Sequence, residues 1–351
     1  MRLSVCLIVK DEEAVIGRCL ECASKFADEI IVVDTGSRDK TKEIACKYTD
    51  LIYDFKWVDD FSLARNYSFS KATCDYVMWL DADDVIDGED IDKISELKKN
   101  LRKDTYMLKY DVAFDEFGHT TFSYYRERIF KKCNLAFWVG FVHEAIMPFG
   151  EIEYLDIKIK HKKEKKTKPK RNLKIYQKHI AKKEQLSARQ QYYYSKELYF
   201  NRYYKKCEKE LKKYLKMENK FEPNEIDALL TLSKCYLKNN NKSKALGLLL
   251  KNLQNITPNS EYLCEIGDLY IHNNKLHQAL IFYEGATNII PDYKSGQFVN
   301  KTYYYLYPYL QLTMIYYRLN DYEKSKKYHI LSRSCDSTKA SVIYNEQFFK
   351  S

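Results

Sequence analysis

The first part of the chain alternates short apolar runs with stretches in which apolar residues recur at helical spacing. Short continuous apolar runs predict buried strands, and a spacing of about 3.6 residues predicts amphipathic helices. The predicted strands are 3–10, 28–37, 51–55 and 76–84, and the predicted helices are 12–26, 40–48, 61–72 and 90–101. Such alternation is typical of a mostly parallel sheet covered by helices on both faces. We therefore expect a Rossmann-like α/β domain over residues 1–157.

The second half of the chain repeats itself at a regular period. Tyr236 and Tyr270 are separated by 34 residues in the chain, and Pro258 and Pro291 by 33. Paired helices at a period of about 34 residues are typical of tetratricopeptide repeats. We therefore expect an all-α repeat domain over residues 191–340. Its tyrosine stripes either pack between helices or line a concave face that binds a partner.

Charge is concentrated between the two predicted domains. The net charge of the 351 residues is +10, and residues 158–183 carry much of the excess. We expect residues 158–190 to form a basic linker and helix, whose lysines are solvated or contact an acidic partner or a membrane surface. We expect no nucleic-acid partner.

Composition points to a soluble chain. A transmembrane helix needs about 20 predominantly apolar residues in a row, and the sequence has no such run. The 10 cysteines are scattered, which favours a reduced, cytoplasmic protein over a disulfide framework. Cys19 and Cys22 have redox-motif spacing, but they lie in an amphipathic stretch, so we expect core residues there.

The stretch "WLDADD" (79–84) holds the most distinctive chemistry. Asp81, Asp83 and Asp84 follow an apolar strand directly, and ligands of α/β sheets bind beyond the carboxyl ends of the strands. Adjacent carboxylates repel each other, and a Mn²⁺ or Mg²⁺ ion would relieve that repulsion. The alternative is a solvated acidic turn. Asp34 and the turn that begins at Lys10 lie at strand ends of the same kind.

Four stretches in order resemble a known family. They are "SVCLIVKDEE" (4–13), "DEIIVVDTGSRDKT" (28–41), "FSLARNYSFSKATCDYVMWLDADD" (61–84) and "RERIFKKCNLAFWVGFVHE" (126–144). Together they resemble the inverting glycosyltransferases of family 2, which have the GT-A nucleotide-sugar-binding fold. The resemblance implies a metal-dependent transferase that uses a nucleotide sugar, most simply a UDP-sugar.

The resemblance also implies roles for individual residues. The implied nucleotide-sugar-binding residues are Asp34, Arg65, Asp81 and Lys10; the implied metal ligands are Asp83, Asp81 and His143; and the implied catalytic residues are Glu144 and Asp84. Asp34 would accept a hydrogen bond from the nucleobase, and Glu144 would be the general base. Asp81 would act on the ribose or through water, and Asp84 on the metal or the sugar. Many family members place an acidic pair where this chain has His143 and Glu144.

The fused repeats bear on the acceptor. A catalytic domain joined to repeats resembles bacterial enzymes that glycosylate proteins or peptides, including flagellin modifiers and S-glycosyltransferases of antimicrobial peptides. We expect transfer of a hexose or N-acetylhexosamine from a UDP-sugar to a protein or peptide side chain. The repeats would hold that acceptor or form a homodimer. One alternative is a cytoplasmic glycosyltransferase of surface-glycan or lipid-linked saccharide assembly. Another is a non-catalytic repeat scaffold.

Overall fold

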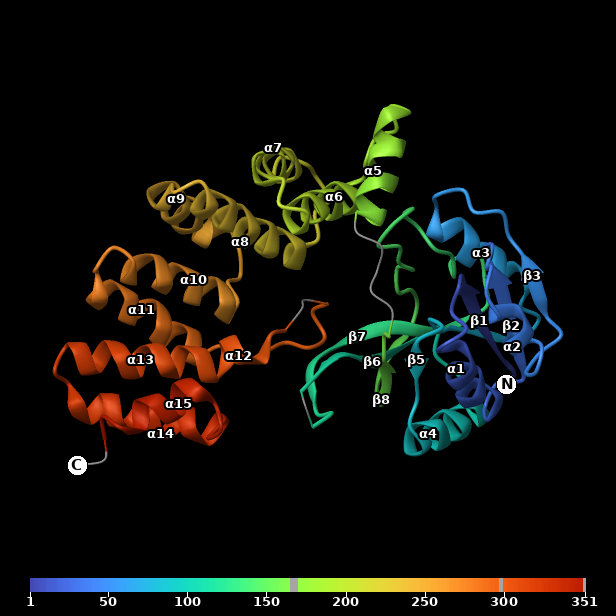
Figure 1. Cartoon of the computed structure of the whole chain (residues 1–351), viewed down its shortest axis with the longest axis horizontal. Helices are drawn as coiled ribbons and strands as arrows, with labels where there is room; N and C mark the ends of the chain where they lie inside the picture. Colours follow the sequence, from blue (N-terminus) through green and yellow to red (C-terminus); the bar gives the residue numbers. More distant parts are fainter. Residues whose placement is uncertain (116, 165–169, 297–298, 350–351) are drawn as a thin grey trace. The chain divides into compact units, whose positions relative to one another are not determined.

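The chain divides into two compact units in the computed structural model. The structure describes residues 1–115, 117–164, 170–296 and 299–349. The first unit is Met1–Gln185 and the second is Leu186–Ser351 (Figure 1).

The described part of the first unit is built on one eight-stranded sheet in the order β3-β2-β1-β4-β7-β6-β8-β5. Its strands are β1 (Leu3–Val9), β2 (Glu29–Asp34), β3 (Ile52–Asp54), β4 (Tyr76–Trp79), β5 (Asp84–Val85), β6 (Thr105–Phe114), β7 (Thr120–Lys131) and β8 (Ile152–His161). Its helices are α1 (Ile16–Ser24), α2 (Thr41–Ala45), α3 (Phe61–Lys71), α4 (Gly88–Lys99) and α5 (Arg171–Ala181). The strands β3, β2, β1 and β4 run parallel, and β7 joins β4 antiparallel. The predicted α/β fold is confirmed.

The strand β1 shows why this segment lies at the centre of the sheet. Its residues are apolar almost throughout, as expected for a strand covered on both faces. Alternate side chains enter two different cores: Leu7 packs in the core that also contains residues of α1 and α4, whereas Cys6 packs in the core that contains Phe69 of α3. The parallel strands therefore point their carboxyl ends toward a single edge, where the carboxylates of residues 81–84 gather.

The first unit continues beyond the predicted domain boundary at 157. The strand β8 crosses that position because Ile157 and Ile159 alternate with lysines and are buried in the core. The helix α5 also belongs to this unit. The stretch predicted as a basic linker and helix thus begins with the end of a strand and contains the helix α5, while its residues 165–169 lie outside the described residues.

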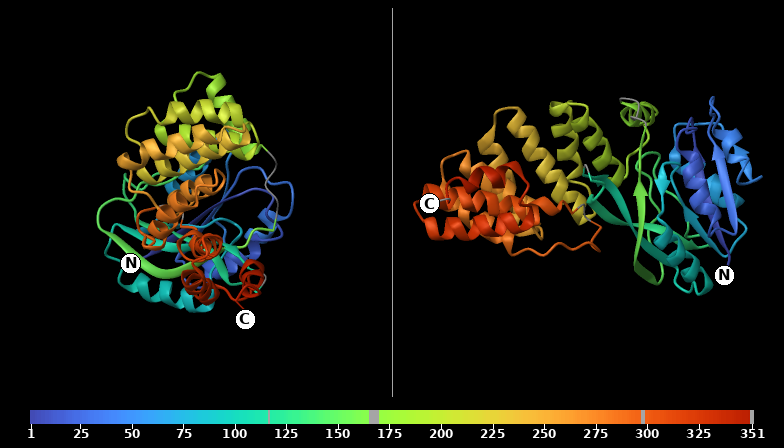
Figure 2. Two further views of the ribbon diagram at one scale, coloured as in Figure 1. Left: turned by 90° about the vertical axis from the view of Figure 1, so that its left-hand side faces the viewer. Right: turned by 60° about the horizontal axis from the view of Figure 1, so that its bottom comes forward.

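The second unit consists of helices joined by short turns. They are α6 (Ala188–Phe200), α7 (Tyr204–Tyr214), α8 (Glu222–Lys238), α9 (Lys242–Asn252), the 3₁₀ turn η1 (Leu253–Asn255), α10 (Ser260–Ile271), α11 (Leu276–Thr287), α12 (Lys301–Tyr304), α13 (Leu306–Arg318), α14 (Tyr322–Cys335) and α15 (Ala340–Glu346). They stack largely as helix pairs, such as α8 with α9 and α10 with α11 (Figure 2). The predicted helical repeats are confirmed.

Small residues and tyrosines at the repeat positions explain the close packing of these pairs. A Cβ atom on Gly267 of α10 would lie 2.6 Å from the ring of Tyr283 on α11, so only glycine fits there. The hydroxyl groups of Tyr283 and Tyr307 both donate hydrogen bonds to Asp268. These tyrosines pack between helices. None of the described helices has both the length and the apolar composition that crossing a membrane requires.

Candidate active site

A pocket of about 1000 Å³ opens at the carboxyl ends of β1 and β4 in the first unit. Lys10 lines it from the end of β1, and Asp81 and Asp83 line it from the loop after β4. His143 and Glu144 line it from the loop before β8. The pocket therefore gathers six of the eight site residues predicted from the sequence: Lys10, Arg65, Asp81, Asp83, His143 and Glu144.

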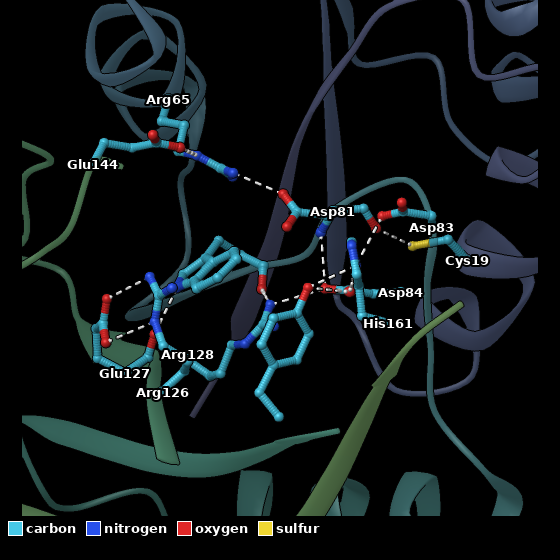
Figure 3. A network of polar contacts seen from close by, with 12 residues as sticks. Cys19, Arg65, Asp81, Asp83, Asp84, Arg126, Glu127, Arg128, Glu144 and His161 are labelled. Atoms are coloured by element: carbon cyan, nitrogen blue, oxygen red, sulfur yellow. Dashed lines mark hydrogen bonds and ion pairs between the residues drawn. The ribbon is translucent and has the colours of Figure 1, made fainter. Parts of the chain in front are cut away.

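Three carboxylates and one imidazole form a cluster (Figure 3), and all of its members except the buried Asp84 line this pocket. Asp81, Asp83, Asp84 and His161 each offer a ligand atom, and these atoms all lie within 4.8 Å of one another. His161 reaches the cluster because β8 pairs antiparallel with β5, which sets His161 opposite Asp84. Its Nδ1 lies 3.2 Å from Asp83 Oδ1 and 3.3 Å from Asp84 Oδ1.

The charge of the neighbouring aspartates acts on the imidazole. Burial alone would lower the pKa of His161, but the hydrogen bonds and charges of Asp83 and Asp84 raise it to about 10. The hydroxyl of Tyr110 lies 2.7 Å from the same Nδ1 and donates to Asp84 Oδ1 at 3.0 Å. The ring is thus held among oxygen atoms at the pocket.

Asp84 is the most enclosed member of the cluster. Its side chain and that of Arg128 are both fully buried, and Arg128 Nη1 lies 2.9 Å from Asp84 Oδ2. The same oxygen accepts a hydrogen bond from the backbone N–H of Asp81 at 3.0 Å. The guanidinium of Arg128 also stacks on Trp79, 3.6 Å from the ring centroid. Asp84 therefore holds the loop in shape from within the core and lies outside the pocket lining.

Arg65 joins the cluster to the candidate base. Its Nη2 lies 2.7 Å from Asp81 Oδ1, and its Nε lies 2.7 Å from Glu144 Oε1. Burial would lower the pKa of Arg65, but the two carboxylates raise it above its ordinary value. Burial likewise opposes ionisation of Asp81, yet the charge of Arg65 holds the pKa of that carboxyl below its usual range. Arg65 is buried between these groups and fixes both of them.

The backbone of the acidic loop is fixed from several elements. The thiol of Cys19 on α1 donates to the carbonyl of Asp81 at 3.2 Å. The backbone N–H of Lys162, just after β8, donates to the carbonyl of Asp83 at 2.9 Å. Cys19 is buried in the core, as the sequence predicted, and burial raises the pKa of its thiol.

Asp34 lies at the end of β2, beside the pocket wall formed by Thr35. Its Oδ1 accepts hydrogen bonds from the backbone N–H groups of Gly36 and Ser37 at 2.7 and 2.8 Å. Its Oδ2 is buried and has no hydrogen-bond partner among the described residues. A buried acceptor without a partner carries a free-energy cost of about 1–3 kcal/mol, so a donor group that reached this oxygen would be stabilising.

His143 does not join the metal-binding cluster. It lines the pocket beside Glu144 with a positive φ of 53°, whereas His161 supplies the imidazole next to Asp83. His143 as a metal ligand therefore stays a prediction, and the geometry adds His161, which the sequence had not suggested, as a further candidate. The alternation of isoleucine and lysine in residues 157–160 could have predicted a strand that ends at His161. That strand brings His161 to the acidic loop.

Comparisons with known proteins agree with this geometry. Residues 4–149 match the family described as "Glycosyl transferase family 2". The N-terminal domain is a family 2 glycosyltransferase domain.

Two curated proteins are similar to this chain, one a glycosyltransferase and the other a repeat protein. The chain is 28% identical over 251 residues to the "SPbeta prophage-derived glycosyltransferase SunS" of Bacillus subtilis, a match that covers 67% of this chain and 58% of that one. It is 45% identical over 83 residues to a "TPR repeat-containing protein" of Synechococcus elongatus, covering 24% and 21%. The chain thus spans between about a fifth and three fifths of the length of these relatives. The solved structure of S. aureus TarS 1-349 aligns with a TM-score of 0.37 at 15% identity, covering 79% of this chain and 91% of that one.

Proposed function

We propose that the chain transfers one sugar, a hexose or N-acetylhexosamine, from a UDP-sugar to a protein or peptide side chain, with inversion at the anomeric carbon. The observation that carries this proposal is the carboxylate–imidazole cluster at a pocket within a family 2 glycosyltransferase domain. The repeat unit supports the choice of a polypeptide acceptor, because stacked helical repeats expose extended binding surfaces.

The residues of the cluster fit a divalent cation. Mg²⁺ and Mn²⁺ prefer hard oxygen ligands, and Mn²⁺ accepts imidazole as well. Asp83 and His161, together with Asp81, would hold the ion, since their ligand atoms lie within 4.8 Å of one another. When bound, the ion supplies countercharge to the diphosphate of the nucleotide sugar.

The chain's own residues then account for orientation and proton transfer. The unpartnered Asp34 Oδ2 suits an N–H donor of the nucleobase. Arg65 holds Asp81 and Glu144 at fixed positions on the two sides of its guanidinium. The acceptor nucleophile forms a bond to the anomeric carbon as the bond from that carbon to the diphosphate oxygen breaks. The carboxylate of Glu144 takes the nucleophile's proton, the role of a general base.

Donor hydrolysis without acceptor tests the catalytic part of this proposal. The purified chain is incubated with UDP-glucose, UDP-galactose or UDP-N-acetylglucosamine and Mn²⁺, and released UDP is measured. We expect slow hydrolysis that a chelator abolishes and that Asp83→Ala reduces by at least about a hundredfold, the effect of losing a principal electrostatic contribution. The matched control is Asp92→Ala, which removes an exposed carboxylate on α4. Hydrolysis by Asp83→Ala at the control rate would refute the assignment.

A further inference from the structure

The helix α5 extends the pocket on the side of Glu144. Arg171, Lys174 and Lys178 of this helix all line the pocket. Its opposite side packs into the first unit: the Phe141 ring stacks on His179 with ring centroids 3.9 Å apart, and Tyr176 is fully buried. The helix is therefore anchored to the domain, and three of its cationic side chains line the pocket that also contains the candidate base.

The contacts of α5 join it to residues 59–61 and, through them, to the loop that carries the candidate base. Lys178 Nζ lies 2.6 Å from Asp59 Oδ2, and the guanidinium of Arg171 lies 5.0 Å from the ring centroid of Phe61. The backbone N–H of Phe61 in turn donates to the carbonyl of Phe141, three residues before Glu144. The described contacts of α5 thus join it to the walls next to Glu144, whereas the acidic cluster is bound by β5, β8 and α1.

The pocket as a whole is lined by charges of both signs, but the charged side chains that α5 contributes to it are cationic. The helix α5 contains no acidic residue. Glu144 shares Arg65 with Asp81, and Asp59 is paired with Lys178. Arg171 and Lys174 also line the pocket, and Lys174 forms no ion pair within the part of the chain that the structure describes. A wall that carries one sign of charge attracts ligand groups of the opposite sign.

Aromatic side chains complete this wall. The rings of Trp57 and Phe61 meet edge to face with centroids 4.7 Å apart, and both line the pocket. An aromatic wall next to cationic groups suits a polypeptide, because apolar parts of the chain can pack on the rings while carboxylates meet the cations.

We propose that Arg171 and Lys174, with Trp57 and Phe61, form the acceptor side of the pocket and select an acidic peptide segment next to the side chain that is modified. This inference rests on the proposed transfer to a polypeptide. It assigns the basic helix to substrate recognition, and membrane binding by the same cations is an outcome of the test below.

Binding of an acidic peptide tests the inference without donor or turnover. The probe is a fluorescein-labelled octaglutamate, with octalysine and octaglutamine as comparison peptides, and affinity is read by fluorescence anisotropy on the full chain. We expect octaglutamate to bind in a salt-sensitive manner and the comparison peptides to bind weakly. The double variant Arg171→Glu/Lys174→Glu should lower octaglutamate affinity by at least about tenfold, because it replaces attraction by repulsion. The matched control, Lys182→Glu/Lys183→Glu, makes the same charge change beyond the end of α5 and should lower it far less.

Three outcomes would overturn the inference. One is equal weakening by the two double variants, which would reflect net charge alone. Another is a loss of UDP affinity in the presence of Mn²⁺ as large as the loss of peptide affinity, which would assign the cations to the diphosphate. The third is binding to phosphatidylserine vesicles that the pocket variant abolishes and octaglutamate does not displace, which would assign the helix to a membrane. Because the peptide assay needs no donor, failure of UDP-sugar hydrolysis would refute the catalytic proposal separately.

Discussion

Breaking the buried ion pair between Arg128 and Asp84 should strongly destabilise the first unit. Both side chains are fully buried, and the two charged atoms lie 2.9 Å apart. At that separation an effective dielectric of about 20 gives an attraction of about 6 kcal/mol, part of which offsets the desolvation of the two charges. Removing only one partner leaves the other charge buried and uncompensated, which costs about 3–5 kcal/mol. Arg128→Met should therefore lower the free energy of unfolding by that amount.

An exposed pair of similar length provides the control. Lys42 Nζ lies 2.8 Å from Asp54 Oδ1, and the two side chains are 45% and 76% exposed. Solvent screens such a pair, so Lys42→Met should cost at most about 1 kcal/mol. If distance alone mattered, the two variants would lose equal amounts of unfolding free energy. If burial matters, Arg128→Met should lose several times more than Lys42→Met.

Tryptophan fluorescence provides a readout specific to this unit. The three tryptophans of the chain, Trp57, Trp79 and Trp138, all lie in the first unit. Urea unfolding followed by their emission thus reports on this unit without the repeats. A chelator should be present, because a bound cation would compensate the charge left on Asp84.

A double variant checks the physical cause. Asp84→Asn removes the negative charge but keeps an acceptor oxygen, so adding it to Arg128→Met should recover part of the lost stability. Two results would refute the reasoning. In the first, Arg128→Met lowers the free energy of unfolding by no more than Lys42→Met does. In the second, the double variant loses as much free energy of unfolding as Arg128→Met and Asp84→Asn lose when added together.

Three further predictions concern packing, pH and the site. Gly267→Ala should destabilise the repeats by about 1–3 kcal/mol in thermal unfolding followed by circular dichroism, because its Cβ would lie 2.6 Å from the Tyr283 ring; Gly247→Ala, with nothing within 4 Å of the added Cβ, should instead be neutral or slightly stabilising. Burial lowers the pKa of His329 below its ordinary 6.5, so the unfolded chain binds the proton more readily, and stability should fall as pH drops below that value. Urea unfolding at several pH values should show this slope, and His329→Gln should flatten it. Arg65→Lys should reduce donor hydrolysis by at least about tenfold while preserving charge, since one ammonium cannot span both carboxylates in the fixed geometry of a guanidinium.

The sequence predicted the parallel half of the sheet because its strands are continuously apolar and end at polar loops. The strand β4 ends at Trp79, directly before the acidic loop, so the position of the carboxylates followed from local pattern. The same holds for the repeats, whose small residues recur at the helix contacts. Local patterns of this kind are visible in one sequence because they recur at fixed spacing.

The imidazole of the cluster was missed for a physical reason. The lysine-rich composition of residues 158–183 pointed to a solvated linker, while the alternation of Ile157 and Ile159 with lysines pointed to a strand. The segment forms a strand because one face of β8 packs against the core of the folded domain. His161 then reaches Asp84 through strand pairing across 77 residues of chain, a separation that no local pattern encodes.

Each of the three aspartates has a positively charged partner, and that partner determines whether replacing the aspartate tests catalysis or folding. Asp81 is paired with Arg65, and Asp84 with Arg128. A guanidinium carries no acceptor and keeps its charge, so neither arginine can itself be a ligand. Asp83 is paired instead with His161, a side chain that is itself a common metal ligand. Replacing Asp84 would unbalance a fully buried arginine, so loss of activity there would not separate catalysis from folding. Asp83→Ala leaves both arginine pairs intact, and for that reason a loss of turnover in a folded Asp83 variant is the result that bears on chemistry.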